Sequence, residues 1–188
     1  MGRVILSPLF IILFFGWRMF VSETYIVEDC FYANLTEQSI SNSSTTVYSA
    51  MCTGLEAIIS SNFELSFDIN NVSGNNGGAL NIGAKSQYTP PSSANYRMSI
   101  GIDTKKFNLN NRTSSSSATS GSSISDNTYY PMKLVKQSGT WYAYANDSST
   151  AFASETPNWI GNYNEYDLYF AGWTSCNMKL KNIKLKLL

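Results

Sequence analysis

Carboxylates are the main candidates for acid–base chemistry in this sequence, because it contains no histidine. The absence of histidine removes the Ser-His-Asp triad, the histidine-ligated metal site and the histidine proton shuttle. Glu64 and Asp68 have an i, i+4 spacing, which places both on one strand face with starting points roughly 13 Å apart. Apolar residues alternate with them, so we interpret both carboxylates as solubilising charge on the outside of a strand.

The other aspartates considered as metal ligands occur singly along the chain, at Asp103, Asp126, Asp147 and Asp167. Calcium needs several convergent oxygen ligands, usually including more than one carboxylate. We therefore expect no metal and no other cofactor. A calcium site assembled from distant loops is the less favoured alternative.

Aromatic side chains are unusually numerous, with twelve tyrosines and four tryptophans. Their flat apolar face and polar tip suit stacking on a sugar ring or on a protein partner. Strand alternation prevents Trp141 from sharing a face with Tyr142 and Tyr144, so at least one of these sets packs inward. Core packing is the favoured role for any single aromatic residue. Recognition residues concentrate on loops, so the candidate ligand-binding residues are Tyr88, Tyr130, Trp159 and Tyr163.

The composition favours a single β-rich domain. Its 188 residues and 20.9 kDa fall within the range of about 100–200 residues that is usual for one domain. Thirteen basic and thirteen acidic residues leave no excess positive charge for phosphates, so we expect no nucleic-acid partner. Serine and asparagine fill 28 and 19 positions, a mixture that suits an extracellular or virion β-protein.

The N-terminus carries an apolar segment. Residues 4–17 follow Arg3 and are mostly apolar, but a bilayer span needs roughly 20 such residues. A positive start and an apolar stretch are two of the three parts of a secretory signal, and a clear cleavage site is missing. We expect residues 1–24 to be a leader (a signal, an anchor or a misassigned start) and residues 25–188 to form the domain. The alternative is an apolar strand or helix that packs on the domain.

Cysteines and glycosylation sequons bear on whether the chain is exported from the cell. Cys30, Cys52 and Cys176 form no C-x-x-C pair, and three buried thiols are slightly favoured over one disulfide with a free thiol, which would require export. Asn-x-Ser/Thr sequons mark surface loops only if the host glycosylates. The five sequons begin at Asn34, Asn42, Asn71, Asn111 and Asn146.

Apolar and polar residues alternate with a period of two from about Tyr25 onward, which predicts an all-β chain. The clearest strand covers residues 62–69, with its apolar residues on one face. Residues 129–137 and 140–146 flank Ser138-Gly139 and predict a β-hairpin. Further strands are expected at residues 46–51, 55–60, 79–84, 95–102, 105–110 and 166–173. Both faces of the last of these read as at least half buried.

A serine-rich segment and the C-terminal strand need separate interpretations. Residues 113–127 contain one isoleucine in fifteen positions and are expected to form a mobile loop. In residues 177–188 the apolar positions change from even to odd near Asn182, which predicts a β-bulge. We interpret the lysines of this strand as a solvated face that protects a sheet edge, with a membrane or polyanion surface less favoured. They are Lys179, Lys181, Lys184 and Lys186.

These segments add up to about ten to twelve strands separated by Gly, Pro and Asn turns, which is typical of a two-sheet sandwich or a barrel. Uncovered edges on so many strands would promote aggregation, which favours two stacked sheets. We therefore predict an all-β fold, a two-sheet antiparallel jelly-roll sandwich.

Five motifs occur together in this order: NFELSFDI, GGALNIGAKSQY, YYPMKLVKQSGTWYAYAND, EYDLYFAGW and KNIKLKLL. The set resembles the concanavalin A-like, laminin-G-like lectin superfamily. More narrowly, it is similar to modules from tail and receptor-binding proteins of bacterial and archaeal viruses and from microbial surface proteins. The resemblance covers roughly residues 28–188. It implies a concanavalin A-like jelly roll whose last strand returns beside the early strands.

The superfamily also contains glycoside hydrolases, whose run Glu-x-Asp-x-x-Glu or Glu-x-Asp-x-Glu supplies the acid and the nucleophile. Here Glu165-Tyr166-Asp167 is followed by no third carboxylate. Retaining hydrolysis needs two carboxyl groups about 5–5.5 Å apart. Because the third carboxylate of the hydrolase motif is missing, we expect a protein that is not an enzyme.

We expect a non-catalytic module that binds a glycan or a surface receptor, as part of a viral tail or a cell-surface protein. A structural or oligomerisation domain without its own ligand is the main alternative, and a glycoside hydrolase is the least favoured one. Expected partners beyond the ligand are further copies of the chain or virion neighbours. Membrane contact is expected only through residues 4–21, if they are not cleaved, and the expected location is extracellular or on the virion surface.

Overall fold

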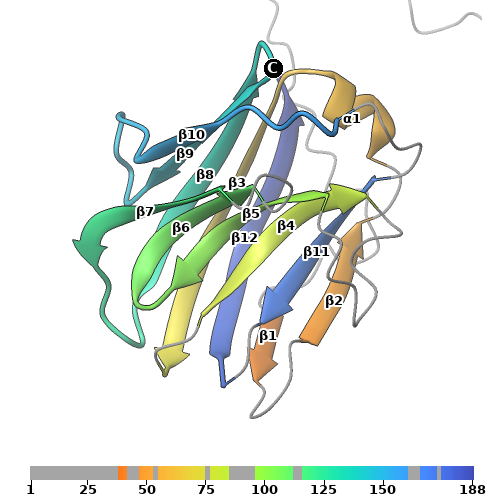
Figure 1. The fold of residues 1–188 in the computed structure, drawn as a ribbon. Helices are drawn as coiled ribbons and strands as arrows, with labels where there is room; N and C mark the ends of the chain where they lie inside the picture. Colours follow the sequence, from red (N-terminus) through yellow and green to blue (C-terminus); the bar gives the residue numbers. More distant parts are fainter. Residues whose placement is uncertain are drawn as a thin grey trace, which may run out of the picture.

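In a computed structural model, the protein folds into two stacked antiparallel sheets (Figure 1). The structure describes residues 38–41, 47–52, 55–74, 77–84, 96–111, 116–160, 166–172 and 175–188. Within these ranges the chain forms twelve strands and one short helix, α1 (Glu56–Ser60). The predicted all-β, two-sheet antiparallel sandwich is confirmed.

Each sheet has six strands in the described part of the chain. The first sheet runs, in spatial order, β1 (Gln38–Ser41), β12 (Asn177–Leu187), β3 (Phe63–Ser73), β8 (Tyr129–Gln137), β9 (Thr140–Ala145) and β10 (Ala153–Glu155). The second sheet runs β2 (Val47–Cys52), β11 (Tyr166–Gly172), β4 (Gly78–Ala84), β5 (Arg97–Asp103), β6 (Lys106–Asn111) and β7 (Ser116–Ser123). The last strand therefore returns between two early strands, as the resemblance implies.

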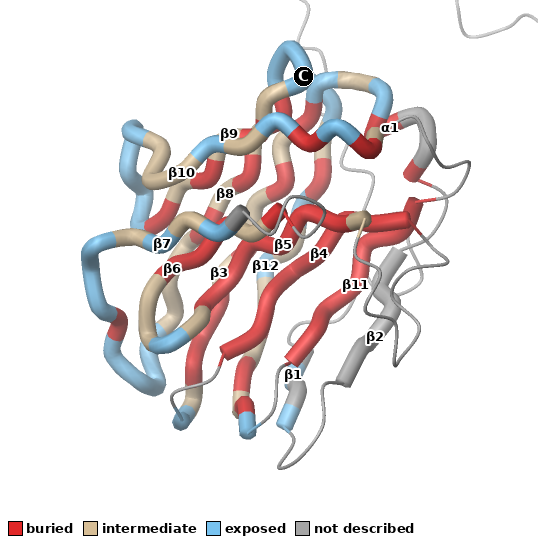
Figure 2. The backbone as a smooth tube through the Cα atoms, viewed as in Figure 1, coloured by how far each residue is buried: buried red, intermediate tan, exposed pale blue. Residues whose placement is uncertain are grey.

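The core lies between the two sheets, where the apolar side chains of both inner faces pack together. Figure 2 shows buried residues along strands of both sheets. Alternation in β3 sends every second residue, from Phe63 to Ile69, into this layer. Two strands away from β3, Trp141 of β9 is fully buried and meets Phe63 edge to face, with ring centroids 5.1 Å apart. Tyr142 and Tyr144 point the other way and are half-buried. The inward direction of one aromatic set in β9 is thus confirmed.

The hairpin and the bulge are both confirmed. Ser138 and Gly139 link β8 to β9 with φ angles of 51° and 85°, which suits a turn that matches the twist of paired strands. In β12 the register with β3 shifts between Lys181 and Lys184, so one extra residue keeps Leu180 and Leu185 on the core side. β11 is buried along its whole length, as expected.

The lysines of β12 do not protect a sheet edge, contrary to our interpretation. β12 pairs with β1 on one side and with β3 on the other. Its lysines instead cover the outer face of the first sheet. Lys181 lies over the ring of Tyr129, 3.9 Å from the centroid, and Lys186 is 3.7 Å from the carboxylate of Glu64.

The segment 55–60, expected as a strand, contains helix α1. Leu55, Ile58 and Ile59 follow an i, i+3, i+4 pattern and are all buried, which a single helical turn achieves and a strand does not. The ammonium group of Lys136 donates hydrogen bonds to the carbonyl oxygens of Ile59 (2.6 Å) and Ser61 (3.0 Å). A buried lysine thus fastens α1 to the first sheet.

The segment 113–127, expected as a mobile loop, contains strand β7. This strand pairs with β6 at the edge of the second sheet. Its described side chains are mostly exposed, so backbone pairing holds it, together with the hydrogen bond that the Asn108 amide donates to the Ser117 hydroxyl (2.9 Å). Composition could not predict β7, because an edge strand does not need apolar residues.

Two of the five sequons cannot mark surface sites in the folded chain. Asn71 is 1% exposed and Asn111 is 3% exposed, and Asn111 accepts a hydrogen bond from the indole of Trp159. Asn146 is exposed, and Asn34 and Asn42 lie outside the described residues. Cys176 is buried, and the choice between buried thiols and a disulfide stays open because Cys30 and the side chain of Cys52 are not described.

The leader at residues 1–24 lies outside the described residues, and its boundary with the domain stays a prediction. None of the described helical residues forms a segment long and apolar enough to cross a bilayer.

Lys136 provides a test of how α1 is held. The residue is 6% exposed, and burial lowers its pKa from the ordinary 10.5. Between the folded pKa and 10.5, the unfolded chain therefore binds more protons than the folded chain. The stability that Lys136 contributes rises with pH across this window, and it falls as pH drops through the folded pKa. Lys136→Met should lower the free energy of unfolding by about 1–3 kcal/mol near pH 10, because two carbonyls lose a donor, and by less near pH 7.

Urea unfolding at the two pH values measures this difference. Lys133→Met, on the outer face of the same strand, should change the free energy of unfolding by no more than about 0.5 kcal/mol. A loss of stability for Lys136→Met that is equal at both pH values would show that burial does not shift the pKa of Lys136.

Candidate functional site

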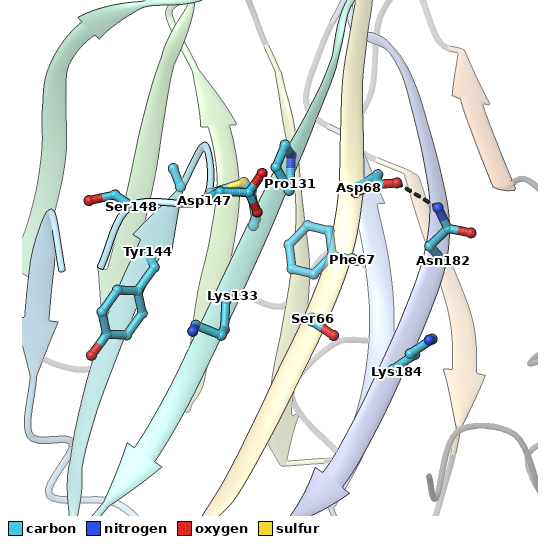
Figure 3. Close-up of a pocket in the computed structure, with 12 residues that line it drawn as sticks. Ser66, Phe67, Asp68, Pro131, Lys133, Tyr144, Asp147, Ser148, Asn182 and Lys184 are labelled. Carbon is cyan, nitrogen blue, oxygen red and sulfur yellow. Dashed lines mark hydrogen bonds between the residues drawn. The ribbon is translucent and has the colours of Figure 1, made fainter. Parts of the chain in front are cut away.

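The outer face of the first sheet carries an open cavity of about 560 Å³ (Figure 3). Ligand pockets usually measure about 300–1,000 Å³. We call this cavity the outer pocket, and its polar lining includes Ser66, Asp68, Lys133, Tyr144, Asp147 and Asn182. On the outer face of the second sheet, Asn81 and Ser99 at the centre are both 1% exposed.

Strand register assembles the floor of the outer pocket. Ser66 of β3 lies opposite Lys133 of β8 and opposite Lys184 of β12, and Lys133 lies opposite Tyr144 of β9. These four residues form one row across four strands, on the face that points away from the core. The ammonium group of Lys133 lies 4.8 Å from the centre of the Tyr144 ring, and Figure 3 shows the lysine leaning toward the tyrosine.

The β-bulge of β12 shapes one side of the pocket. Its extra residue gives Asn182 a φ of 54°, a left-handed conformation that asparagine adopts more readily than most residues. The Asn182 amide donates a 2.6 Å hydrogen bond to one carboxylate oxygen of Asp68 (Figure 3). The bulge therefore holds Asp68 in a fixed direction along the face.

The turn between β9 and β10 shapes the opposite side. Asn146 and Asp147 both have positive φ, 57° and 56°. The backbone N–H of Asn146 donates to the carbonyl of Pro131 (2.8 Å), which fastens the turn to β8. Ser148 accepts a hydrogen bond from the N–H of Thr150 at 3.0 Å. These bonds place Asp147 and Ser148 over the end of the pocket.

The outer pocket can recognise a molecule rich in hydroxyl groups. Carboxylate oxygens of Asp68 and Asp147 can accept hydrogen bonds, while the amide of Asn182 and the ammonium of Lys133 can donate them. Hydrogen bonds that involve charged groups are the stronger ones, worth about 1.5–3 kcal/mol each. A half-buried tyrosine adds an apolar ring surface. The pocket thus combines acceptors and donors with a small apolar surface.

Of the four residues predicted from sequence to bind a ligand, two can be placed. Trp159 is 1% exposed, and its indole N–H donates to Asn111 at 3.3 Å. A buried ring cannot stack on a ligand, so the structure corrects this assignment to a core role. Tyr130 is half-buried, edge-on to Phe107 at 5.4 Å, and its hydroxyl accepts from the N–H of Ser125.

Tyr88 and Tyr163 lie outside the described residues, and their role stays a prediction. The structure brings neither Tyr130 nor Trp159 to the outer pocket. Sequence reasoning did place Asp68 on an outer strand face, yet it missed the neighbours that make this residue part of a pocket. The signal that could have found them was the bulge near Asn182 combined with the hairpin at Ser138-Gly139.

No metal site emerges from the carboxylates that the structure describes. No group of three or more His, Cys, Asp or Glu side chains in this part of the chain lies close enough to hold a metal ion. Asp126 already faces a cation, since Lys105 lies 2.8 Å from its carboxylate, and this hydrogen bond lowers the pKa of Asp126. Asp167 is fully buried in β11, and Glu165 lies outside the described residues.

Comparisons with known proteins support the fold. No protein-family model and no curated protein matches the sequence. Among solved structures, peanut lectin in complex with a peptide has a TM-score of 0.58 and 10% identity, over 81% of this chain and 85% of that chain. The carbohydrate-binding module CBM66 from Bacillus subtilis has a TM-score of 0.51 and 15% identity, over 77% and 84% of the two chains.

A sialidase from Trypanosoma rangeli is also similar, with a TM-score of 0.55 and 10% identity over 80% of this chain. Only 25% of the sialidase chain is covered, so the likeness concerns one part of that enzyme. At such low identities these structures establish the fold alone. The chain shares the two-sheet antiparallel sandwich fold of these structures.

Asn182 allows a test of the bulge. Asn182→Gly keeps the left-handed backbone and should change the free energy of unfolding by no more than about 1 kcal/mol. Asn182→Val forces a β-branched residue into that conformation and should cost about 1–3 kcal/mol. Urea unfolding compares the two variants, and equal stabilities would show that the bulge does not constrain residue 182.

Proposed function

We propose that this chain is a non-catalytic glycan-binding module and that the outer pocket is its binding site. One observation carries the proposal: two carboxylates, an amide, an ammonium group and a tyrosine ring converge on one cavity of about 560 Å³ on the outer face of a lectin-like sandwich. Sugars present hydroxyl groups on several sides and apolar C–H faces between them. The lining offers complementary groups for both.

Binding would follow from the geometry of the pocket. Asp68, held by Asn182, and Asp147, held by its turn, accept hydrogen bonds from sugar hydroxyls. Lys133 donates to ring or hydroxyl oxygens, while Ser148, whose hydroxyl already donates to the carbonyl of Thr150 (2.9 Å), accepts. Fixed side chains lose little conformational entropy on binding. A single site of this kind is weak, and display of several copies on one particle would raise the apparent affinity.

Catalysis is the less favoured use of the same two carboxylates. A retaining hydrolase needs one carboxyl group as acid and the other as nucleophile. One oxygen of Asp68 is already occupied by the hydrogen bond from Asn182. The similar lectin and carbohydrate-binding module are named for binding, which also supports a binding role. A purely structural domain would have no use for the converging polar groups of the pocket.

The proposed setting is a viral tail or a cell-surface protein, with the domain outside the cell or on the virion surface. Support comes from the resemblance of the sequence motifs and from the serine- and asparagine-rich composition. In that setting further copies of the chain or virion neighbours would be additional partners. Mass spectrometry of the natural product, read for the mature N-terminus, disulfides and glycans, tests the setting.

Asp147→Asn tests the binding site. Asparagine tolerates the left-handed backbone at this position, so the fold should be retained while a charged acceptor is lost. We expect binding to the glycans found by an array screen to weaken at least tenfold, measured by isothermal titration calorimetry, which matches the loss of one charge-assisted hydrogen bond.

Asp103→Asn, at the end of β5 in the second sheet, is the matched control and should bind like the unchanged chain. A reducing-sugar assay on the same glycans should detect no product. Unchanged affinity for Asp147→Asn, or turnover that disappears in Asp68→Asn, would contradict a non-catalytic role for the outer pocket.

The expected absence of a metal also yields a prediction. Because no described carboxylate cluster suits calcium, removal of divalent cations with EDTA should leave the glycan affinity unchanged within about twofold. Loss of binding in EDTA, with recovery on addition of calcium, would show that a metal holds the site.

A further inference from the structure

A second, smaller cavity of about 260 Å³ lies at the edge of the sandwich. We call it the edge cavity. It opens between β6 and β7 of the second sheet and the β9–β10 turn of the first sheet. Its walls carry two phenylalanine rings and a set of hydroxyl and amide groups, which come from Phe107, Ser120, Ser122, Asn146, Thr150 and Phe152.

The edge cavity adjoins the outer pocket. Ala145 and Ser148 line both cavities. Asp147 borders the outer pocket, whereas Asn146, the preceding residue, borders the edge cavity. The β9–β10 turn is therefore a common wall, with one cavity on each side of it.

The chemistry of the edge cavity differs from that of the outer pocket, because no charged side chain lines it. Phe152 is half-buried, and its ring centroid lies 6.3 Å from that of Phe107 at an angle of 37°. The Ser122 and Thr150 hydroxyls and the Asn146 amide can donate and accept hydrogen bonds, whereas the Ser120 hydroxyl, which donates to the carbonyl of Ser122, can accept them. An uncharged sugar unit, with apolar C–H groups on one face and hydroxyls around its rim, matches this lining.

The walls of the edge cavity are held in place. The backbone N–H of Phe152 donates to the carbonyl of Ala143 (2.8 Å), which fixes the far end of the turn to β9. On the facing strand the Ser120 hydroxyl donates to the carbonyl of Ser122 (3.1 Å). Phe107 packs edge-on against Tyr130. A preformed cavity avoids the ordering cost that weakens binding to mobile segments.

We propose that the edge cavity is a second saccharide subsite, so that the chain binds an oligosaccharide across the β9–β10 turn rather than a single sugar. The charged groups of the outer pocket would hold one unit, and the uncharged edge cavity would hold a neighbouring unit. This inference rests on the proposed glycan-binding function. It names the ligand class as an oligosaccharide with an uncharged unit beside the unit in the outer pocket.

The test is a glycan array that carries glucose, galactose, mannose, N-acetylglucosamine and sialic acid, each alone and as the terminal unit of di- to tetrasaccharides. The unchanged chain should bind the best disaccharide or longer glycan at least tenfold more tightly than its terminal monosaccharide. Ser122→Phe, at an exposed position of β7 that lines the edge cavity, fills the cavity and should remove this gain. Its affinity for the monosaccharide should stay within about twofold.

Thr119→Phe adds the same ring at an exposed position of β7 outside the lining and should retain the gain. Circular dichroism and urea unfolding check that both variants fold. Equal affinity of the unchanged chain for monosaccharide and oligosaccharide would overturn the second subsite and leave the outer pocket standing. A gain that Ser122→Phe keeps would do the same, whereas binding to no glycan would overturn both proposals.

Discussion

Packing of two apolar sheet faces against each other is the constraint on which the rest of this structure depends. Because side chains alternate along each strand, burying one face fixes the direction of every residue on the other. In β3 the buried series from Phe63 to Ile69 forces Glu64, Ser66 and Asp68 outward. The outer face of the first sheet is therefore a by-product of core packing, and its polar residues need not stabilise the fold.

The irregular points of the sheet carry the candidate site. A regular face would present parallel rows of side chains without a hollow. The bulge at Asn182 and the turn at Asn146 and Asp147 interrupt this regularity with left-handed residues. Each is fastened by a hydrogen bond to a neighbouring strand, to Asp68 and to Pro131 respectively. The two irregularities enclose the outer pocket between them.

Alternation and turn chemistry are local signals, and they were enough to predict most of the fold, including the hairpin at Ser138-Gly139 and the bulge. These signals failed at two segments that do not show the alternation of a half-buried strand. The turn of helix at Leu55, Ile58 and Ile59 is too short to establish a helical period. The serine-rich strand β7 forms through backbone pairing at a sheet edge and shows no apolar alternation.

The candidate site was harder to predict, because it depends on register between strands that are far apart in sequence. Ser66, Lys133 and Lys184 become neighbours only through two separate strand pairings. Loop position alone was a misleading criterion for Trp159, which lies in a connecting segment but packs in the core against Tyr166 and Asn111. Burial within a loop cannot be read from composition.

A saccharide bound to the outer face of the first sheet changes the environment of the backbone amides around it. Titration of the isotope-labelled chain with an array-selected glycan, followed by backbone amide NMR, measures these changes. The largest chemical-shift changes should fall on Ser66, Lys133, Asp147 and Asn182. Changes confined to the second sheet, for example around Asn81 and Ser99, would contradict binding at this face.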